Sequence, residues 1–259
     1  MMKSIAIFSL KGGVGKSTCA VNLAWASATL SARRTLLWDL DPQGAATFLL
    51  APAREPKDSA KAIFTREIEP KKLCRPTLFR RLDLLAADPS LQGLERLLFG
   101  LEKRKRLAKL LKGLEPHYDR LILDCPPGLN ETAEQVLHAA DLLVVPVIPS
   151  PLARKTLDDL SALLVQRGGR HPPILPVFSM VDRRRRLHRA ALDQYPDWPR
   201  ISYASVVEQM GSRQRPLASF AANHAASGQF AALWEVIERR LAMPAADQGS
   251  GDLAPRAAE

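Results

Sequence analysis

The chain has 259 residues, 46% hydrophobic and 25% charged, which is the composition of a globular protein that can bury its own core. No apolar run reaches the ~18 residues that a membrane-spanning helix needs. Lys and Arg outnumber Asp and Glu by 37 to 27, and the net charge of +10 favours a polyanionic partner, either nucleic acid or an acidic membrane surface.

The first residues lead from a short apolar stretch directly into glycines, without the long hydrophobic region of a signal peptide. Three cysteines, Cys19, Cys74 and Cys125, fall in no C-x-x-C pair and no metal-ligand spacing. We therefore expect neither a disulfide framework nor a zinc site, and we interpret Cys19 and Cys125 as small buried hydrophobic residues. These features predict a cytoplasmic protein.

Short aliphatic runs alternate with segments of helical periodicity. The expected strands are 4–9, 34–39, 82–87, 120–125, 142–147 and 174–180. The expected helices are 16–31, 90–113, 130–139, 152–167, 183–194 and 229–242. This alternation predicts an α/β fold, one domain over 1–243, with a mostly parallel twisted sheet and helices on both faces. We expect a loop at 51–61 and a disordered tail at 244–259.

The stretch SLKGGVGKST (9–18) joins the first expected strand to the first expected helix. Glycines there let backbone N–H groups turn toward a phosphate, and the new helix adds the positive end of its dipole. In such a loop the lysine reaches the β- and γ-phosphates and the Ser/Thr hydroxyl binds Mg²⁺, which assigns Lys16 and Ser17. The predicted nucleotide contacts in the loop are Gly12, Gly13, Val14, Gly15, Lys16, Ser17 and Thr18.

Two other motifs place carboxylates at the ends of expected strands. Asp41 lies in LLWDLDPQG (36–44), and Asp124 ends the apolar run of LILDCPPG (121–128). Carboxylates at strand ends opposite a phosphate loop suit Mg²⁺, a hard cation that keeps several waters. Each residue alone has a simpler interpretation, as a turn residue before Pro42 or as a strand-end cap.

The loop reads K-G-G-V-G-K-S-T, with Leu10 where the general phosphate-loop pattern has glycine. With the D-x-D-P-Q stretch and Asp124, it resembles the deviant Walker A motif of the ParA/MinD family of ATPases. The resemblance implies a single-domain P-loop NTPase with ATP and Mg²⁺ as cofactors, which forms a homodimer when ATP is bound.

The resemblance also implies roles for single residues. Lys11 would reach the nucleotide of the facing subunit, as an arginine finger does, beside Lys16 of its own subunit. Asp41 would position the attacking water and would also belong to the Mg²⁺ site, together with Ser17 and Asp124. Taken alone, Lys11 could equally be a solvated loop charge.

Two departures from the family pattern affect other contacts. Ser9 and Leu10 stand where Asn-Gln is common, and 179–182 holds no asparagine for the purine. We therefore assign the adenine contacts to Met180 and Asp182.

The stretch DRRRRLHR (182–189) is too rich in arginine for one helix face. Arginines of this kind would bind DNA phosphates in a sequence-independent, salt-sensitive way, although a solvated charged face is the alternative. The predicted DNA contacts are Arg183, Arg184, Arg185, Arg186, Arg189, Arg213 and Arg215.

A second basic stretch, EKRKRLAKLLKGL (102–114), carries leucines on one helical stripe. It could lie on a membrane, but we favour packing against the sheet, because it leads directly into the strand that ends at Asp124. MinD-type relatives anchor through a basic amphipathic C-terminal helix, whereas this chain ends GDLAPRAAE, so we expect no stable membrane association.

The combined hypothesis is a ParA-like, nucleoid-associated ATPase that positions or segregates a plasmid, a chromosome or a protein assembly. A ParB-like or other cargo adaptor would stimulate its slow hydrolysis of ATP. One alternative is a nucleotide-binding regulatory or scaffolding protein without DNA binding, for example in polysaccharide secretion. Another is an ATP-dependent amidotransferase or metallocluster carrier of the same superfamily.

Overall fold

The computed structural model describes residues 1–50, 60–65, 67–94, 98, 106–166 and 171–243. Its centre is an eight-stranded sheet in the order β3-β4-β2-β5-β1-β6-β7-β8. The strands are β1 Lys3–Ile7, β2 Thr35–Asp39, β3 Arg75–Pro76, β4 Leu82–Leu85, β5 Arg120–Asp124, β6 Leu142–Val147, β7 Ile174–Val181 and β8 Arg200–Ser202. Among the described strands only β3 is antiparallel to its neighbour, which confirms the predicted mostly parallel sheet.

The register brings the chemistry-bearing strand ends together. Asp124 at the end of β5 pairs with Ile7 at the end of β1 on one side and with Asp39 at the end of β2 on the other. Because parallel strands end at the same edge of a sheet, the loops after β1, β2 and β5 leave from one place. This edge carries the candidate site.

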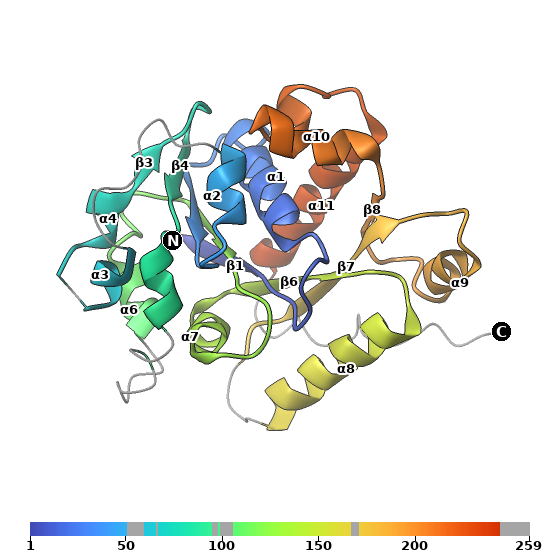
Figure 1. Ribbon diagram of the computed structural model, residues 1–259, viewed down its shortest axis with the longest axis horizontal. Helices are drawn as coiled ribbons and strands as arrows, with labels where there is room; N and C mark the ends of the chain where they lie inside the picture. Colours follow the sequence, from blue (N-terminus) through green and yellow to red (C-terminus); the bar gives the residue numbers. More distant parts are fainter. Residues whose placement is uncertain (51–59, 66, 95–97, 99–105, 167–170, 244–259) are drawn as a thin grey trace.

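Helices cover both faces of the sheet (Figure 1). One face packs against α1 Lys16–Thr29, α2 Ala45–Leu50, α10 Ser205–Arg213 and α11 Ala225–Ala242. The other face packs against α3 Ala60–Thr65, α4 Pro70–Leu73, α6 Arg106–Lys112, α7 Glu131–Ala139, α8 Pro151–Gln166 and α9 Arg186–Gln194. Two 3₁₀ turns, η1 Pro89–Gly93 and η2 Leu217–Ser219, complete the described elements.

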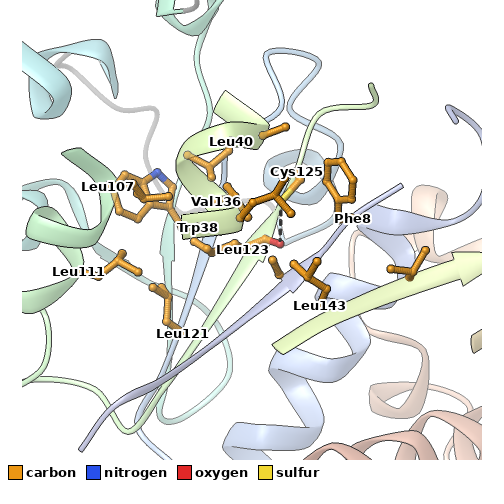
Figure 2. Packing of buried hydrophobic residues seen from close by; sticks show 14 of the residues in the cluster. Phe8, Trp38, Leu40, Leu107, Leu111, Leu121, Leu123, Cys125, Val136 and Leu143 are labelled. Atoms are coloured by element: carbon orange, nitrogen blue, oxygen red, sulfur yellow. Dashed lines mark hydrogen bonds between the residues drawn. The ribbon is translucent and has the colours of Figure 1, made fainter. Parts of the chain in front are cut away.

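Alternate residues of the central strands enter the two cores, as strand geometry requires. Trp38, Leu121 and Leu123 point into the core shown in Figure 2, where they meet α6 and α7. Their neighbours Leu37 and Ile122 point into the core under α1 and α11. A fully buried side chain of this size contributes about 1.5–3 kcal/mol, so the two cores hold the strand ends in place.

The six expected strands all form, and five of the six expected helices form with the same or slightly shifted ends within the described residues. The helix expected at 183–194 begins three residues later, because the Asp182 carboxylate accepts the backbone N–H of Arg184 and holds the preceding residues in a turn. The helix expected at 229–242 begins earlier, at Ala225, after the His224 ring accepts the N–H of Ala226.

Three predicted segments lie partly or wholly outside the described residues. The helix expected at 90–113 is wrong at its start, where the structure has a 3₁₀ turn, and much of its middle lies outside the described residues. The loop expected at 51–61 is wrong at its end, since Ala60 begins α3, and its other residues up to 59 are not described. The predicted tail, 244–259, also falls outside the described part.

The described part of the basic stretch before β5, residues 106–114, packs against the sheet as favoured. Leu107, Leu111 and Leu114 are buried in the same core as Trp38, and Leu110 packs at its margin. No helix within the described ranges is both long and apolar enough to cross a membrane.

The interpretation of two cysteines as small hydrophobic residues is confirmed. Cys19 and Cys125 are buried, and burial raises the pKa of the Cys19 thiol to about 12. The Cys125 thiol donates to the Leu123 carbonyl, the dashed line in Figure 2, and burial also raises its pKa. Neither thiol is therefore a thiolate near neutral pH.

Candidate nucleotide site and arginine loop

The glycine loop has the backbone that a phosphate cradle needs. Gly13 and Gly15 have φ angles of 72° and 86°, in the left-handed region where a side chain would be strained. Gly15 is the N-cap of α1, and no side chain caps this helix end. The first N–H groups of α1, together with its dipole, thus face the loop without a competing side-chain acceptor.

Lys16 begins α1 and is only 7% exposed, although lysine is rarely buried without a partner. It has no ion pair with any residue that the structure describes. Ser17 follows it, half-buried. A buried ammonium at the mouth of a glycine loop fits a site for an anion of high charge.

Asp124 is completely buried, and within the described structure neither of its carboxylate oxygens makes a hydrogen bond of regular geometry, although the Ser17 hydroxyl lies close enough to interact with them. Burial raises the pKa of this carboxyl well above its usual value, and the neighbouring Asp39 raises it further. The Ser17 hydroxyl and the Lys16 ammonium act in the opposite direction. A cation beside Asp124 would satisfy both oxygens and favour the charged form.

The donor set fits Mg²⁺ in particular. No group of three or more His, Cys, Asp or Glu side chains in the described ranges could hold a metal ion by itself. Mg²⁺ does not need one, because it binds through one or two carboxylates and takes its other ligands from water and phosphate oxygens. Ser17 and Asp124 would hold the ion, which when bound would neutralise charge on the phosphates.

Asp41 lies in the loop after β2 and is 8% exposed. Its Oδ1 accepts the N–H of Gln43 at 2.9 Å, whereas Oδ2 has no hydrogen bond to another described residue. Asp41 also raises the pKa of Asp124, so the structure brings these two carboxylates close together, as the motifs predicted. The role of Asp41 in positioning water stays a prediction.

A third carboxylate, Asp39, was not assigned a role from the sequence. It is completely buried and lies level with Asp124 on the adjacent strand. Burial raises its pKa, while hydrogen bonds from Thr47 and Asp41 oppose this effect. The D-x-D spacing was the available signal, but it did not show which of the two carboxylates is enclosed.

Lys11 directly precedes the glycines of the phosphate loop and is half-buried. Its backbone N–H donates to the Ser9 hydroxyl at 3.2 Å, and the residue lines a small hollow against Val147 and Leu157. The ammonium forms no ion pair within the described part of the chain. Its action on a facing subunit is untested in a single chain and stays a prediction.

Met180 and Asp182 lie at the end of β7, but in different surroundings. Met180 has a φ of 52°, and its Cε lies 3.7 Å from the position that a Cβ on Gly15 would occupy. Asp182 instead binds Arg184 through both oxygens, at 2.9 and 3.0 Å, and this guanidinium lowers the pKa of Asp182 to about 2. Met180 is therefore beside the phosphate loop, whereas the Asp182 carboxylate is already paired.

The arginine loop, residues 183–186, is exposed and locally ordered. Arg189 donates to the backbone carbonyls of Arg183 and Arg184, and the buried His188 ring accepts the N–H of Asp182. Burial lowers the pKa of His188, which favours the neutral ring that this bond requires.

The seven predicted DNA contacts divide into paired and unpaired arginines. Arg184 is held by Asp182, whereas Arg183, Arg185 and Arg186 have no ion pair among the described residues. Arg213 ends α10 and Arg215 follows two residues later, and the Arg213 guanidinium lies 4.8 Å from the centre of the Phe220 ring. The structure thus brings five of the seven arginines together in one loop and the start of α9.

A parallel sheet with a glycine loop between β1 and α1, a buried lysine in that loop and acidic residues after β2 and β5 defines a P-loop NTPase. The family comparison narrows this class. The model of the AAA domain family matches residues 2–167. The chain belongs to the ParA/MinD family of ATPases within this class, as its motifs predicted.

Three known proteins illustrate the relationship. The chromosome partitioning protein ParA of Myxococcus xanthus is 39% identical over 63% of this chain and 59% of its own length. A ParA family protein of Chlamydia pneumoniae is 32% identical over 66% of this chain and 68% of its own. The septum site-determining protein MinD of Pyrococcus horikoshii, solved with Mg-ADP, has the same fold, with a TM-score of 0.77, 20% identity and coverage of 92% and 97%. The match to the Myxococcus protein thus spans less than two thirds of that relative.

Proposed function

We propose that this protein is a ParA-like ATPase that binds ATP with Mg²⁺, closes into a homodimer around the nucleotide and binds duplex DNA without sequence preference. Hydrolysis of ATP would release the DNA, and a ParB-like or other cargo adaptor would accelerate this step. The cargo would be a plasmid, a chromosome or a protein assembly. One relative bears the name of a chromosome partitioning protein, which supports this class of cargo.

The buried Lys16 and the buried Asp124 at the glycine loop carry the proposal. Each is costly to bury in isolation, and each acquires a partner when a phosphate chain and its Mg²⁺ bind. Lys16 would bind the phosphates, Asp41 would orient the attacking water, and Lys11 would stabilise negative charge on the facing subunit's nucleotide. Without a second chain Lys11 lacks that partner, so hydrolysis would depend on dimerisation.

The exposed arginine loop supports DNA binding. Arg183, Arg185 and Arg186 can each contact a phosphate and release counterions, which gives affinity that falls steeply with salt. A dimer presents the loop twice, and two weak contacts on one duplex bind far more tightly than one. ATP would in this way control DNA binding through the oligomeric state.

The test replaces Arg183, Arg185 and Arg186 together by Ala and compares binding of an arbitrary duplex with and without Mg-ATP. We expect DNA affinity to fall by about 10-fold or more, with ATP hydrolysis retained. The matched control is the triple replacement of Arg75, Arg80 and Arg81, which removes the same charge at β3 and the turn before β4, at the opposite edge of the sheet from β8.

Two outcomes would contradict the proposal. If both triple variants lose affinity equally, the effect is that of net charge and the loop is not the DNA site. If the wild-type protein binds Mg-ATP but never retains DNA, a regulatory or scaffolding role without DNA binding replaces the proposed one.

A further inference from the structure

The buried carboxylate of Asp39 is the centre of a hydrogen-bond network at the catalytic edge. Its Oδ2 accepts two bonds from Thr47 on α2, one from the backbone N–H and one from the hydroxyl, both at 2.8 Å. Its Oδ1 accepts the backbone N–H of Asp41 at 3.1 Å. Asp39 therefore ties the first turn of α2 to the residue predicted to orient the attacking water.

The direction of the Thr47 hydroxyl is determined by a third bond. Thr47 Oγ1 accepts the backbone N–H of Ala87, just after β4, at 2.9 Å. A hydroxyl has one proton to donate, and here the buried carboxylate of Asp39 receives it. The Thr47 side chain thus joins the end of β2 to the segment that follows β4, which lies 40 residues further along the chain than Thr47.

Asp41 needs such support because its surroundings would displace it. Asp39, Asp41 and Asp124 lie at neighbouring strand ends, and their mutual repulsion contributes to the raised pKa values of Asp39 and Asp124. The loop itself turns through Gly44, whose N–H donates to the Asp41 carbonyl with a φ of 62°. A catalytic group displaced by about 1 Å can lose on the order of 100-fold in rate.

We propose that Thr47 is a positioning residue for ATP hydrolysis: it fixes Asp39, and through Asp39 it holds the backbone of Asp41 so that the Asp41 carboxylate meets the attacking water. This inference rests on the proposed ATPase function and on the catalytic role of Asp41. Thr47 itself touches neither nucleotide nor water in this scheme. Its loss should therefore lower kcat while ATP binding remains.

The primary experiment replaces Thr47 by Val, which keeps the shape and removes the hydroxyl. We expect kcat to fall about 10- to 100-fold, with the Kd for Mg-ATP changed less than about threefold. Thr47→Ser should recover most of the rate, because serine restores both hydroxyl bonds. The matched control is Thr77→Val, since the Thr77 hydroxyl also accepts a backbone N–H and donates to a carbonyl, but in the β3–β4 turn.

A merely structural role predicts a different pattern. In that case Thr47→Val would weaken Mg-ATP binding and lower Tm in proportion to the loss of kcat. Thr77→Val would lower Tm and kcat to a similar extent. That result would overturn the proposal. So would an unchanged kcat in Thr47→Val.

A double-mutant cycle separates this inference from the proposed function. Single-turnover hydrolysis is measured for Thr47→Val, Asp41→Ala and both together. If Thr47 acts through Asp41, adding Thr47→Val to Asp41→Ala should lower the single-turnover rate by less than about a further twofold. A slow Asp41→Ala with a fast Thr47→Val overturns only the positioning role, whereas a fast Asp41→Ala removes the catalytic role of Asp41 and this inference with it.

Discussion

The phosphate-loop site and the arginine loop both carry charge, but they hold it in opposite ways. Lys16 and Asp124 are buried, with exposed fractions of 7% and 0%, whereas Arg183, Arg185 and Arg186 project into solvent. Charges in a buried site interact strongly with a ligand because little water screens them, while exposed arginines are screened by water and salt. Single substitutions should therefore have large, all-or-none effects in the first region and small, graded effects in the second.

The largest effect is expected at the phosphate loop, where the two lysines should separate two steps. Lys16→Ala should weaken Mg-ATP binding on the order of 100-fold, because the phosphates lose a buried cation. Lys11→Ala should leave the Kd of the monomer within about threefold and abolish ATP-dependent dimerisation. Calorimetry measures the first quantity and analytical ultracentrifugation the second.

The control for both lysines is Lys155→Ala, since Lys155 is exposed on α8 and paired with Asp159. Unchanged ATP affinity in Lys16→Ala would show that the buried lysine does not serve the phosphates. ATP-dependent dimers of Lys11→Ala would remove its assigned action across the interface.

A smaller, pH-dependent effect is expected at Asp124. In the nucleotide-free protein, Asp124→Asn removes a completely buried carboxyl whose charged form is disfavoured by burial, and it should raise the free energy of unfolding by about 1–3 kcal/mol at pH 8, a few degrees in Tm. The pKa of Asp124 is higher in the folded protein than in the unfolded chain. The wild-type protein therefore loses stability as the pH rises from the unfolded-state pKa to the folded-state pKa of this carboxyl. The advantage of Asp124→Asn should accordingly shrink as the pH falls toward ~4, the unfolded value.

Thermal unfolding between pH 4 and pH 8 measures this difference, and Mg-ATP should stabilise Asp124→Asn less than it stabilises the wild-type protein. The control is Asp193→Asn, because Asp193 is an exposed residue of α9. This variant should match the wild-type protein both in its stability at each pH and in its stabilisation by Mg-ATP. An Asp124→Asn variant that is less stable than the wild type at pH 8 would mean that the carboxylate is satisfied without a cation.

The smallest effects are expected within the arginine loop. Arg186→Ala should lower DNA affinity about threefold, whereas Arg184→Ala should change it less than about twofold, because Arg184 is already bound by Asp182. Fluorescence anisotropy with one duplex at two salt concentrations measures both. Equal losses at the two positions would show that DNA displaces Asp182 from Arg184.

The two regions were also predictable to different degrees. The glycine loop could be assigned from sequence because its glycines, Lys16 and Ser17 are adjacent, and the strand before and helix after it have clear periodicity. The extent of the arginine loop could not, because helix formation from residue 183 competes with the turn that Asp182 imposes. Residues 200–213 contain β8 and α10, which are short and lacked a recognisable pattern.

The local sequence by itself determined the strand–loop–helix unit, the alternation of strands and helices, and the motifs that carry Lys16, Asp41 and Asp124. These depend on residues close together in the chain, whose backbone preferences and hydrophobic spacing act locally. Only the tertiary structure decided which charges are buried and which are paired. Asp39 is enclosed because Thr47 and Ala87, eight and about 50 residues away in sequence, complete its network, and such contacts exist only once the sheet has formed.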